Sequence, residues 1–195
     1  MSSSSFSHAI ADGPTVETTN ALRSLYFLRA AFSITWATLI TFFAGKSVGL
    51  GTALFIIYPV WDVLGTLLDI RANQNSLSKT PQYLNAGISV ITALAVGIAL
   101  RTGVPEALIT FGIWAIITGL IQLILGLRRR KSLSGQWPMI VSGGKSVIAG
   151  GSFIILAHDP TMGIASLAGY AAFGAFYYLL SAFRLSKIRK ATATS

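Results

Sequence analysis

Six apolar stretches of about 20 residues recur along this chain and limit what it can fold into. As a helix, each stretch is long enough to cross the ~30 Å hydrocarbon core of a bilayer. A membrane β-barrel would instead show alternating segments of about ten residues, and these stretches are uniformly apolar. The sequence therefore predicts an all-α polytopic membrane protein with six transmembrane helices. The expected spans are Ser24–Ala44, Val48–Ile70, Gln82–Leu100, Val104–Leu127, Pro138–Ala157 and Thr161–Phe183.

Charged residues make up only 11% of the chain, against about 25% in a typical soluble domain, and the basic ones gather on one side of the predicted bundle. The other side carries only Lys46 and Arg101. Because basic segments flanking transmembrane helices stay in the cytoplasm, we expect a multi-pass membrane protein with both termini cytoplasmic. The residues on the expected cytoplasmic side are Arg23, Arg71, Lys79, Arg128, Arg129, Arg130, Lys131, Arg184, Lys187, Arg189 and Lys190.

The net charge of +9 is accounted for by this topological bias, so nucleic acid is not an expected partner. The expected partner is the lipid bilayer, with anionic headgroups contacting the cluster of Arg128, Arg129, Arg130 and Lys131. The chain has no cysteine, which excludes disulfides and thiolate metal sites, and no motif calls for a cofactor.

The two ends of the chain are predicted to be cytoplasmic tails, over residues 1–21 and 188–195. The first is rich in Ser and Thr and lacks an apolar core, so it is not a signal peptide and is typical of a disordered segment. The second is basic. The transmembrane domain then covers residues 22–187.

The chain repeats itself at a period of about 56 residues. One shift aligns the small residues early in each odd-numbered span, the residues in the centre of each even-numbered span, and the basic exits that follow. Each unit holds two spans, so all copies enter the membrane in the same orientation, unlike the inverted repeats of many transporters. We expect three parallel two-helix hairpins, over 22–71, 81–128 and 138–184. The aligned columns are Tyr58, Trp114 and Tyr170; Phe55, Phe111 and Leu167; and Ala31, Gly87 and Gly143.

The fifth span carries a row of small residues, Ser142, Ser146 and Gly150, which Gly143, Gly144 and Gly151 widen. Small residues four positions apart let membrane helices approach closely. We interpret the row as a helix contact.

The repeated unit has a recognisable form, in which a helix rich in small residues is followed by a short turn and a second helix with a basic exit. The first copy contains LRAAFSITWATLITFFAG and FIIYPVWDVLGTLLDIR, and the third contains SGGKSVIAGGSFIILAHDPTMGIASLAGYAAFGAFYYLLSAFR. These segments resemble the HdeD-like family of small bacterial membrane proteins. The resemblance implies six transmembrane helices in the inner membrane and an association with acid resistance. It implies no catalytic residues, and the lysine in GGKS and the aspartate in YPVWD depart from the family pattern.

Two ionisable residues of opposite sign are predicted at matching depth inside the membrane. Lys145 lies about 12 Å in from Trp137, and Asp62 about 13 Å in from Arg71. A buried carboxylate is either protonated or paired. We expect Asp62 to pair with Lys145, or failing that with Arg29, whose long side chain can instead reach the headgroups. Such a pair is either a structural lock between helices or a proton-responsive polar site, and a third outcome is no contact.

Known catalytic patterns do not fit the chain, so we expect no enzyme. GGKS at Gly143–Ser146 lacks the first glycine of a phosphate-binding loop, because Met139 stands in its place. Asp62 and Asp69 lie on one helix, whereas a membrane aspartyl protease needs carboxylates from two helices. The leading interpretation is a non-enzymatic membrane protein linked to acid or envelope stress. The alternatives are a small transporter or channel with a buried polar site, and an accessory subunit of a membrane complex.

Overall fold

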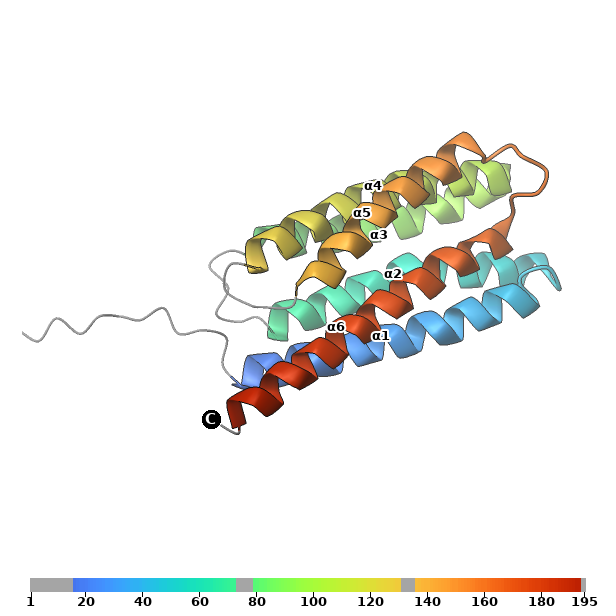
Figure 1. Cartoon of the computed structure of the whole chain (residues 1–195). Helices are drawn as coiled ribbons and strands as arrows, with labels where there is room; N and C mark the ends of the chain where they lie inside the picture. Colours follow the sequence, from blue (N-terminus) through green and yellow to red (C-terminus); the bar gives the residue numbers. More distant parts are fainter. Residues whose placement is uncertain (1–15, 73–78, 131–135, 194–195) are drawn as a thin grey trace, which may run out of the picture.

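The computed structural model describes residues 16–72, 79–130 and 136–193, and these residues form six long α-helices (Figure 1). Each helix is long and apolar enough to cross a membrane. The predicted fold class, six transmembrane helices in three parallel hairpins, is therefore confirmed. The helices are α1 (Val16–Phe43), α2 (Val48–Ala72), α3 (Thr80–Thr102), α4 (Val104–Arg129), α5 (Trp137–Ile155) and α6 (Leu167–Ala193), with a 3-10 turn η1 (Ile164–Ser166) before α6.

The first and last helices extend further than the sequence predicted. Helix α1 begins at Val16, inside the expected tail, and α6 continues to Ala193. The two helices pack on each other here, and the buried side chains of Leu22 and Leu185 belong to one apolar cluster. Tertiary packing of this kind stabilises helix beyond the span itself. The rest of the expected N-terminal tail, residues 1–15, lies outside the described residues.

The six helices form a closed ring in chain order, because each packs on its sequence neighbours and α6 returns to α1. The most extensive contacts are α4 on α5, α1 on α6 and α2 on α3, which are contacts between hairpins. Contacts within a hairpin, α1 on α2, α3 on α4 and α5 on α6, are smaller. The bundle is thus built from three tightly packed helix pairs, each made of helices from two different repeats.

Glycines produce the tightest of these contacts, between α4 and α5. A Cβ on Gly150 would lie 2.5 Å from the carbonyl oxygen of Gly112, and one on Gly143 would lie 2.7 Å from that of Gly119. Only glycine permits this backbone approach, as in other small-residue helix contacts in membranes. The predicted row does make a helix contact: Gly143, Ser146 and Gly150 face α4, whereas Gly144 and Gly151 have open space around them.

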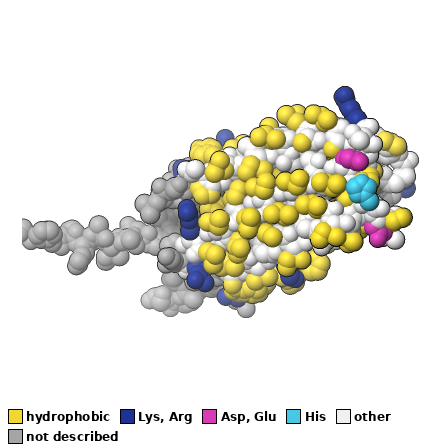
Figure 2. All heavy atoms as spheres, turned by 90° about the horizontal axis from the view of Figure 1, so that it is seen from above, with side chains coloured by type: hydrophobic (Ala, Val, Ile, Leu, Met, Phe, Trp, Pro, Cys, Tyr) yellow, Lys and Arg dark blue, Asp and Glu magenta, His cyan; other side chains and the backbone are white. Residues whose placement is uncertain are grey.

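The two ends of the bundle differ in charge (Figure 2). We call the end that holds the start of α1 and the end of α6 the basic end, and the opposite end the turn end. Exposed Arg128, Arg130 and Arg184 lie toward the helix ends at the basic end, whereas exposed His158 and Asp159 follow α5 at the turn end. The sides between them are covered by apolar side chains, as lipid contact requires.

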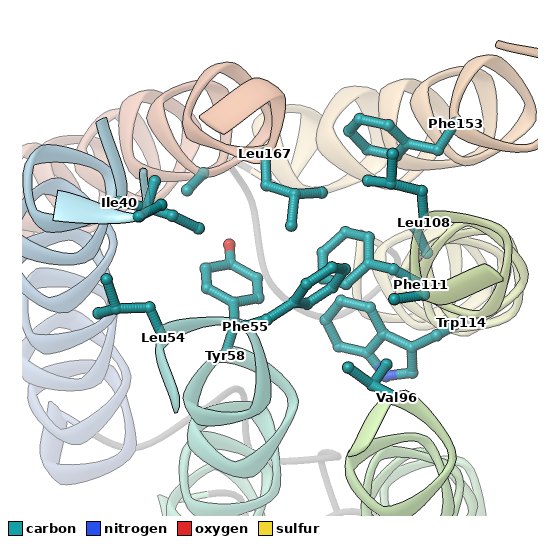
Figure 3. Close-up of a cluster of buried hydrophobic side chains, with 14 of the residues drawn as sticks. Ile40, Leu54, Phe55, Tyr58, Val96, Leu108, Phe111, Trp114, Phe153 and Leu167 are labelled. Atoms are coloured by element: carbon teal, nitrogen blue, oxygen red, sulfur yellow. The ribbon is translucent and has the colours of Figure 1, made fainter. Parts of the chain in front are cut away.

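The larger apolar cluster lies in the half of the bundle near the turn end, and Figure 3 shows its side chains. Two aligned columns of the repeat meet there. Phe55, Phe111 and Leu167 are fully buried. The aromatic residues of the other column form the boundary of this core, where the ring of Tyr58 lies 6.0 Å from those of Trp114 and Tyr170. Residues one period apart thus converge on the bundle axis.

Candidate functional site

A cavity of about 410 Å³ occupies the other half of the bundle, toward the basic end. Tyr58, Trp114 and Tyr170 close it on the side of the apolar core, and Asp69, Arg129 and Gln136 line it near the basic end. Its volume falls in the range of small-molecule sites. Five charged side chains line the cavity, namely Arg29, Asp62, Asp69, Arg129 and Lys145.

Asp62 on α2 is the centre of a hydrogen-bond network in this cavity. Its carboxylate pairs with Arg29 of α1, with Nη1 of Arg29 3.1 Å from Oδ1. Asn85 Nδ2 and Ser89 Oγ, both on α3, donate to Oδ2 at 2.7 and 2.9 Å. Asn85 Nδ2 also contacts Thr66 Oγ1 at 2.9 Å. Three donors from two other helices therefore stabilise the ionised carboxylate, as a charge inside a membrane requires.

Arg29 turns into the bundle rather than toward the headgroups. Its Nη1 donates to Tyr178 OH of α6 at 2.8 Å in addition to Asp62. The side chains of Arg29 and Asp62 are only 12% and 17% exposed. Space for the guanidinium comes from Gly65, where a Cβ would lie 2.6 Å from Nη2. The site therefore depends on a glycine one helical turn from Asp62.

Lys145 does not reach Asp62, although the sequence suggested it as the first partner. Its ammonium lies over two aromatic rings of α6, 4.7 Å from the centroid of Phe173 and 5.2 Å from that of Tyr177. Among the described residues no carboxylate forms an ion pair with Lys145. Asp62 and Lys145 do line the same cavity, as their predicted depths in the membrane suggested. Depth alone, however, does not determine which side of a helix faces a neighbour.

A second ion pair lies nearer the basic end. Arg129 of α4 donates to Asp69 of α2 from both ends of its guanidinium, at 3.3 and 2.6 Å. Arg129 was expected to contact anionic lipid with its neighbours, but it turns inward, while Arg128 and Arg130 are exposed. The remaining member of that cluster, Lys131, lies outside the described residues.

Polar contacts join the three packed helix pairs across their smaller interfaces. Arg29, in the α1–α6 pair, reaches Asp62 in the α2–α3 pair. Asp69 in that pair binds Arg129 in the α4–α5 pair. The third interface, between α5 and α6, holds a hydrogen bond of 3.2 Å between the hydroxyls of Ser146 and Tyr170.

The site also contains polar residues that sequence reasoning missed, and the repeat would have found them. A shift of 56 residues takes Arg29 to Asn85, and Ser89 to Lys145. The same shift takes Asp62 to Thr118 and then to Gly174, and all three line the cavity. One inward-facing position therefore carries a carboxylate, a hydroxyl and a glycine in the three copies. The three copies therefore share a position that lines the cavity but differ in the side chain at that position.

The side-chain oxygen of Gln136 is a buried acceptor in the cavity wall. Gln136, just before α5, is 3% exposed, and its Oε1 forms no hydrogen bond in the described residues. Buried amides are normally satisfied, so an unpaired acceptor that lines a cavity indicates a place for a solute or water. The arrangement can bind a small polar molecule between groups of both charges.

Comparison with known proteins found no matching family model, no matching curated protein and no matching solved structure.

Proposed function

We propose that this protein is a small membrane transporter that binds a polar solute in the cavity and carries it across the bilayer. The observation that supports this most directly is the cavity itself, which reaches the Arg29–Asp62 pair near mid-span and ends at a layer of aromatic side chains. A cavity that reaches mid-span in one half of the bundle and is closed toward the other half is expected of a carrier whose site faces one side of the membrane. The protein would be non-enzymatic, with no catalytic step.

The packing suggests how the path would change sides. The three tightly packed helix pairs would move as rigid bodies, and the smaller interfaces within the hairpins would open and close between them. The Arg29–Asp62 and Arg129–Asp69 pairs cross these boundaries. A solute that competes for one of these charged groups would weaken the contact and favour the rearrangement, because a ligand shifts an equilibrium only through differential binding.

The chain's lack of cysteine makes thiol labelling a clean test. Thr118→Cys places one thiol in the cavity wall, and Ala115→Cys places one in the fully buried core nearly one turn away on the same helix. A charged, membrane-impermeant thiol reagent added at the basic end should label Thr118→Cys and spare Ala115→Cys. A carrier also predicts slower labelling of Thr118→Cys from the turn end.

Two results would count against transport. If Thr118→Cys is inert from both sides, no hydrated path reaches the cavity. If it reacts from the basic end alone, even under long exposure, the cavity is a fixed binding site.

The resemblance to HdeD-like proteins supports a second proposal, a role in acid or envelope stress. The observation that favours it is Asp62, a carboxylate in a cavity, because loss of its negative charge would remove the electrostatic attraction to Arg29. Cells that rely on this protein for survival at low pH should lose that survival with Asp62→Asn and keep it with Asp159→Asn, which alters an exposed turn. Under either proposal the basic end faces the cytoplasm of a bacterial inner membrane.

A further inference from the structure

Lys145 lies inside a membrane span, and no acidic side chain in the described part of the chain pairs with it. It lies on α5 about 12 Å from the end of the helix at Trp137. Its side chain is exposed, and the groups nearest its ammonium are the rings of Phe173 and Tyr177. Aromatic faces stabilise a cation only in part, and a charge at this depth favours a counter-ion.

The cavity opens sideways at this point. Three of the side chains that line it, Lys145, Ile148 and Phe173, are also exposed on the outside of the bundle. Ile148 is 71% exposed and Phe173 is 58% exposed. The two helices that carry them, α5 and α6, form the smallest of the six contacts between neighbours in the ring. A wall residue that is also exposed on the outside marks an opening, here within the lipid-facing part of the bundle.

The side chains around this opening match those that would bind an amphiphile. A cation stands at its edge, apolar side chains lie on its lipid side, and polar groups of the cavity lie behind it. A water-soluble anion would satisfy the cation alone. A molecule with an anionic head and an alkyl tail would satisfy Lys145 and also cover Ile148 and Phe173.

We propose that an amphiphilic anion, with a phosphate or carboxylate head and an alkyl tail, enters from the bilayer between α5 and α6 and binds with its head against Lys145. The tail stays outside along Ile148 and Phe173. This inference rests on the proposed function, since it names the class of solute that the cavity admits and the direction from which it comes.

Spin-labelled lipids test the proposal on the full chain in phosphatidylcholine vesicles. The fraction of label that the protein immobilises is measured for phosphatidic acid and for phosphatidylcholine that carry the same labelled acyl chain. One basic residue near an anionic headgroup corresponds to about a fivefold preference. We expect wild type to prefer phosphatidic acid, Lys145→Gln to lose about that factor, and Lys145→Arg to retain it.

Lys46 supplies the matched control. Its ammonium also lies over an aromatic ring, 4.5 Å from the centroid of Phe43, but it stands in a turn away from the cavity. Lys46→Gln should leave the preference unchanged. If it lowers the preference as much as Lys145→Gln, the effect is general surface charge and the proposal is overturned. Thermal unfolding of each variant separates loss of binding from loss of fold.

Two further outcomes would also overturn the inference. The first is an undiminished preference in folded Lys145→Gln. The second is displacement of the labelled lipid by inorganic phosphate in solution, which would place the source of the anion in water. The labelling of Thr118→Cys reports on the cavity independently. If Thr118→Cys is labelled but Lys145 gives no preference for phosphatidic acid, only this inference is overturned. If the preference is found but Thr118→Cys is not labelled, only the transport proposal is overturned.

Discussion

The guanidinium of Arg29 lies directly against the backbone of Gly65, so that a Cβ on Gly65 would come within 2.6 Å of Arg29 Nη2. The position of Arg29 in the charge network therefore depends on the absence of a side chain at Gly65 of α2. This absence lets a long side chain from α1 cross the helix boundary and meet Asp62 from the correct side.

Gly65→Ala should therefore destabilise the protein through Arg29. The added methyl forces the guanidinium away from Asp62, and overpacking of this kind costs about 1–3 kcal/mol. The control is Gly87→Ala on α3, where nothing lies within 4 Å of the new Cβ. Because alanine favours helix, Gly87→Ala should be neutral or stabilising by up to about 1 kcal/mol. Thermal unfolding in detergent measures both, and equal effects would show that Arg29 does not need this space.

Arg29 and Asp62 should be energetically coupled. Arg29→Gln leaves Asp62 without its counter-ion, and Asp62→Asn leaves Arg29 without its counter-ion. Each variant should therefore lower stability, and the double variant should recover part of the loss. For side chains in direct contact the interaction energy is about 0.5–3 kcal/mol. Asp62→Asn and Lys145→Gln share no contact and should be additive in the same assay. Coupling of Asp62 to Lys145 rather than Arg29 would contradict the observed geometry.

The α4–α5 contact should fail when its glycines gain side chains. Gly150→Ala places a Cβ 2.5 Å from the carbonyl oxygen of Gly112, so the two backbones must separate. We expect a loss of at least about 1 kcal/mol. Gly151→Ala, on the next residue and in open space, should cause no loss. A tolerated Gly150→Ala, judged by the unfolding midpoint in detergent, would mean that close backbone approach is not needed there.

The orientation in the membrane is the fourth prediction. Reporter fusions after Ser195 and after Thr102 should give opposite answers, with the first active in the cytoplasm, because the basic residues gather at the end where α6 terminates. A fusion after Ser195 that reports an external location would reverse the layout. The cavity would then face the other compartment.

The fold followed from local properties of the chain. Uniformly apolar stretches of bilayer length become helices because hydrocarbon offers no other partner for their backbone groups. The 56-residue shift correctly aligned Tyr58, Trp114 and Tyr170, since the ring of Tyr58 contacts both of the others in the bundle. Helix ends were less predictable, because packing of α1 against α6 extends both helices beyond their spans.

The partners of Asp62 were harder to predict. Its depth showed that it needed one, and both Lys145 and Arg29 were close enough along the membrane normal. Neither the depth of a residue in the membrane nor its charge specifies how its helix is rotated about its own axis. That rotation is decided by the close contact of α4 with α5 at Gly143 and Gly150, which leaves Lys145 facing α6.

The sequence by itself determined the number of spans, the common orientation of the three hairpins and the positions that repeat, because each depends on residue type and spacing along one chain. Only the tertiary structure decided which polar side chains share the cavity, that Arg29 rather than Lys145 pairs with Asp62, and that the tight contacts join different hairpins. The physical reason is that these features depend on how closely two backbones approach and which way each helix turns, and both result from packing among all six helices.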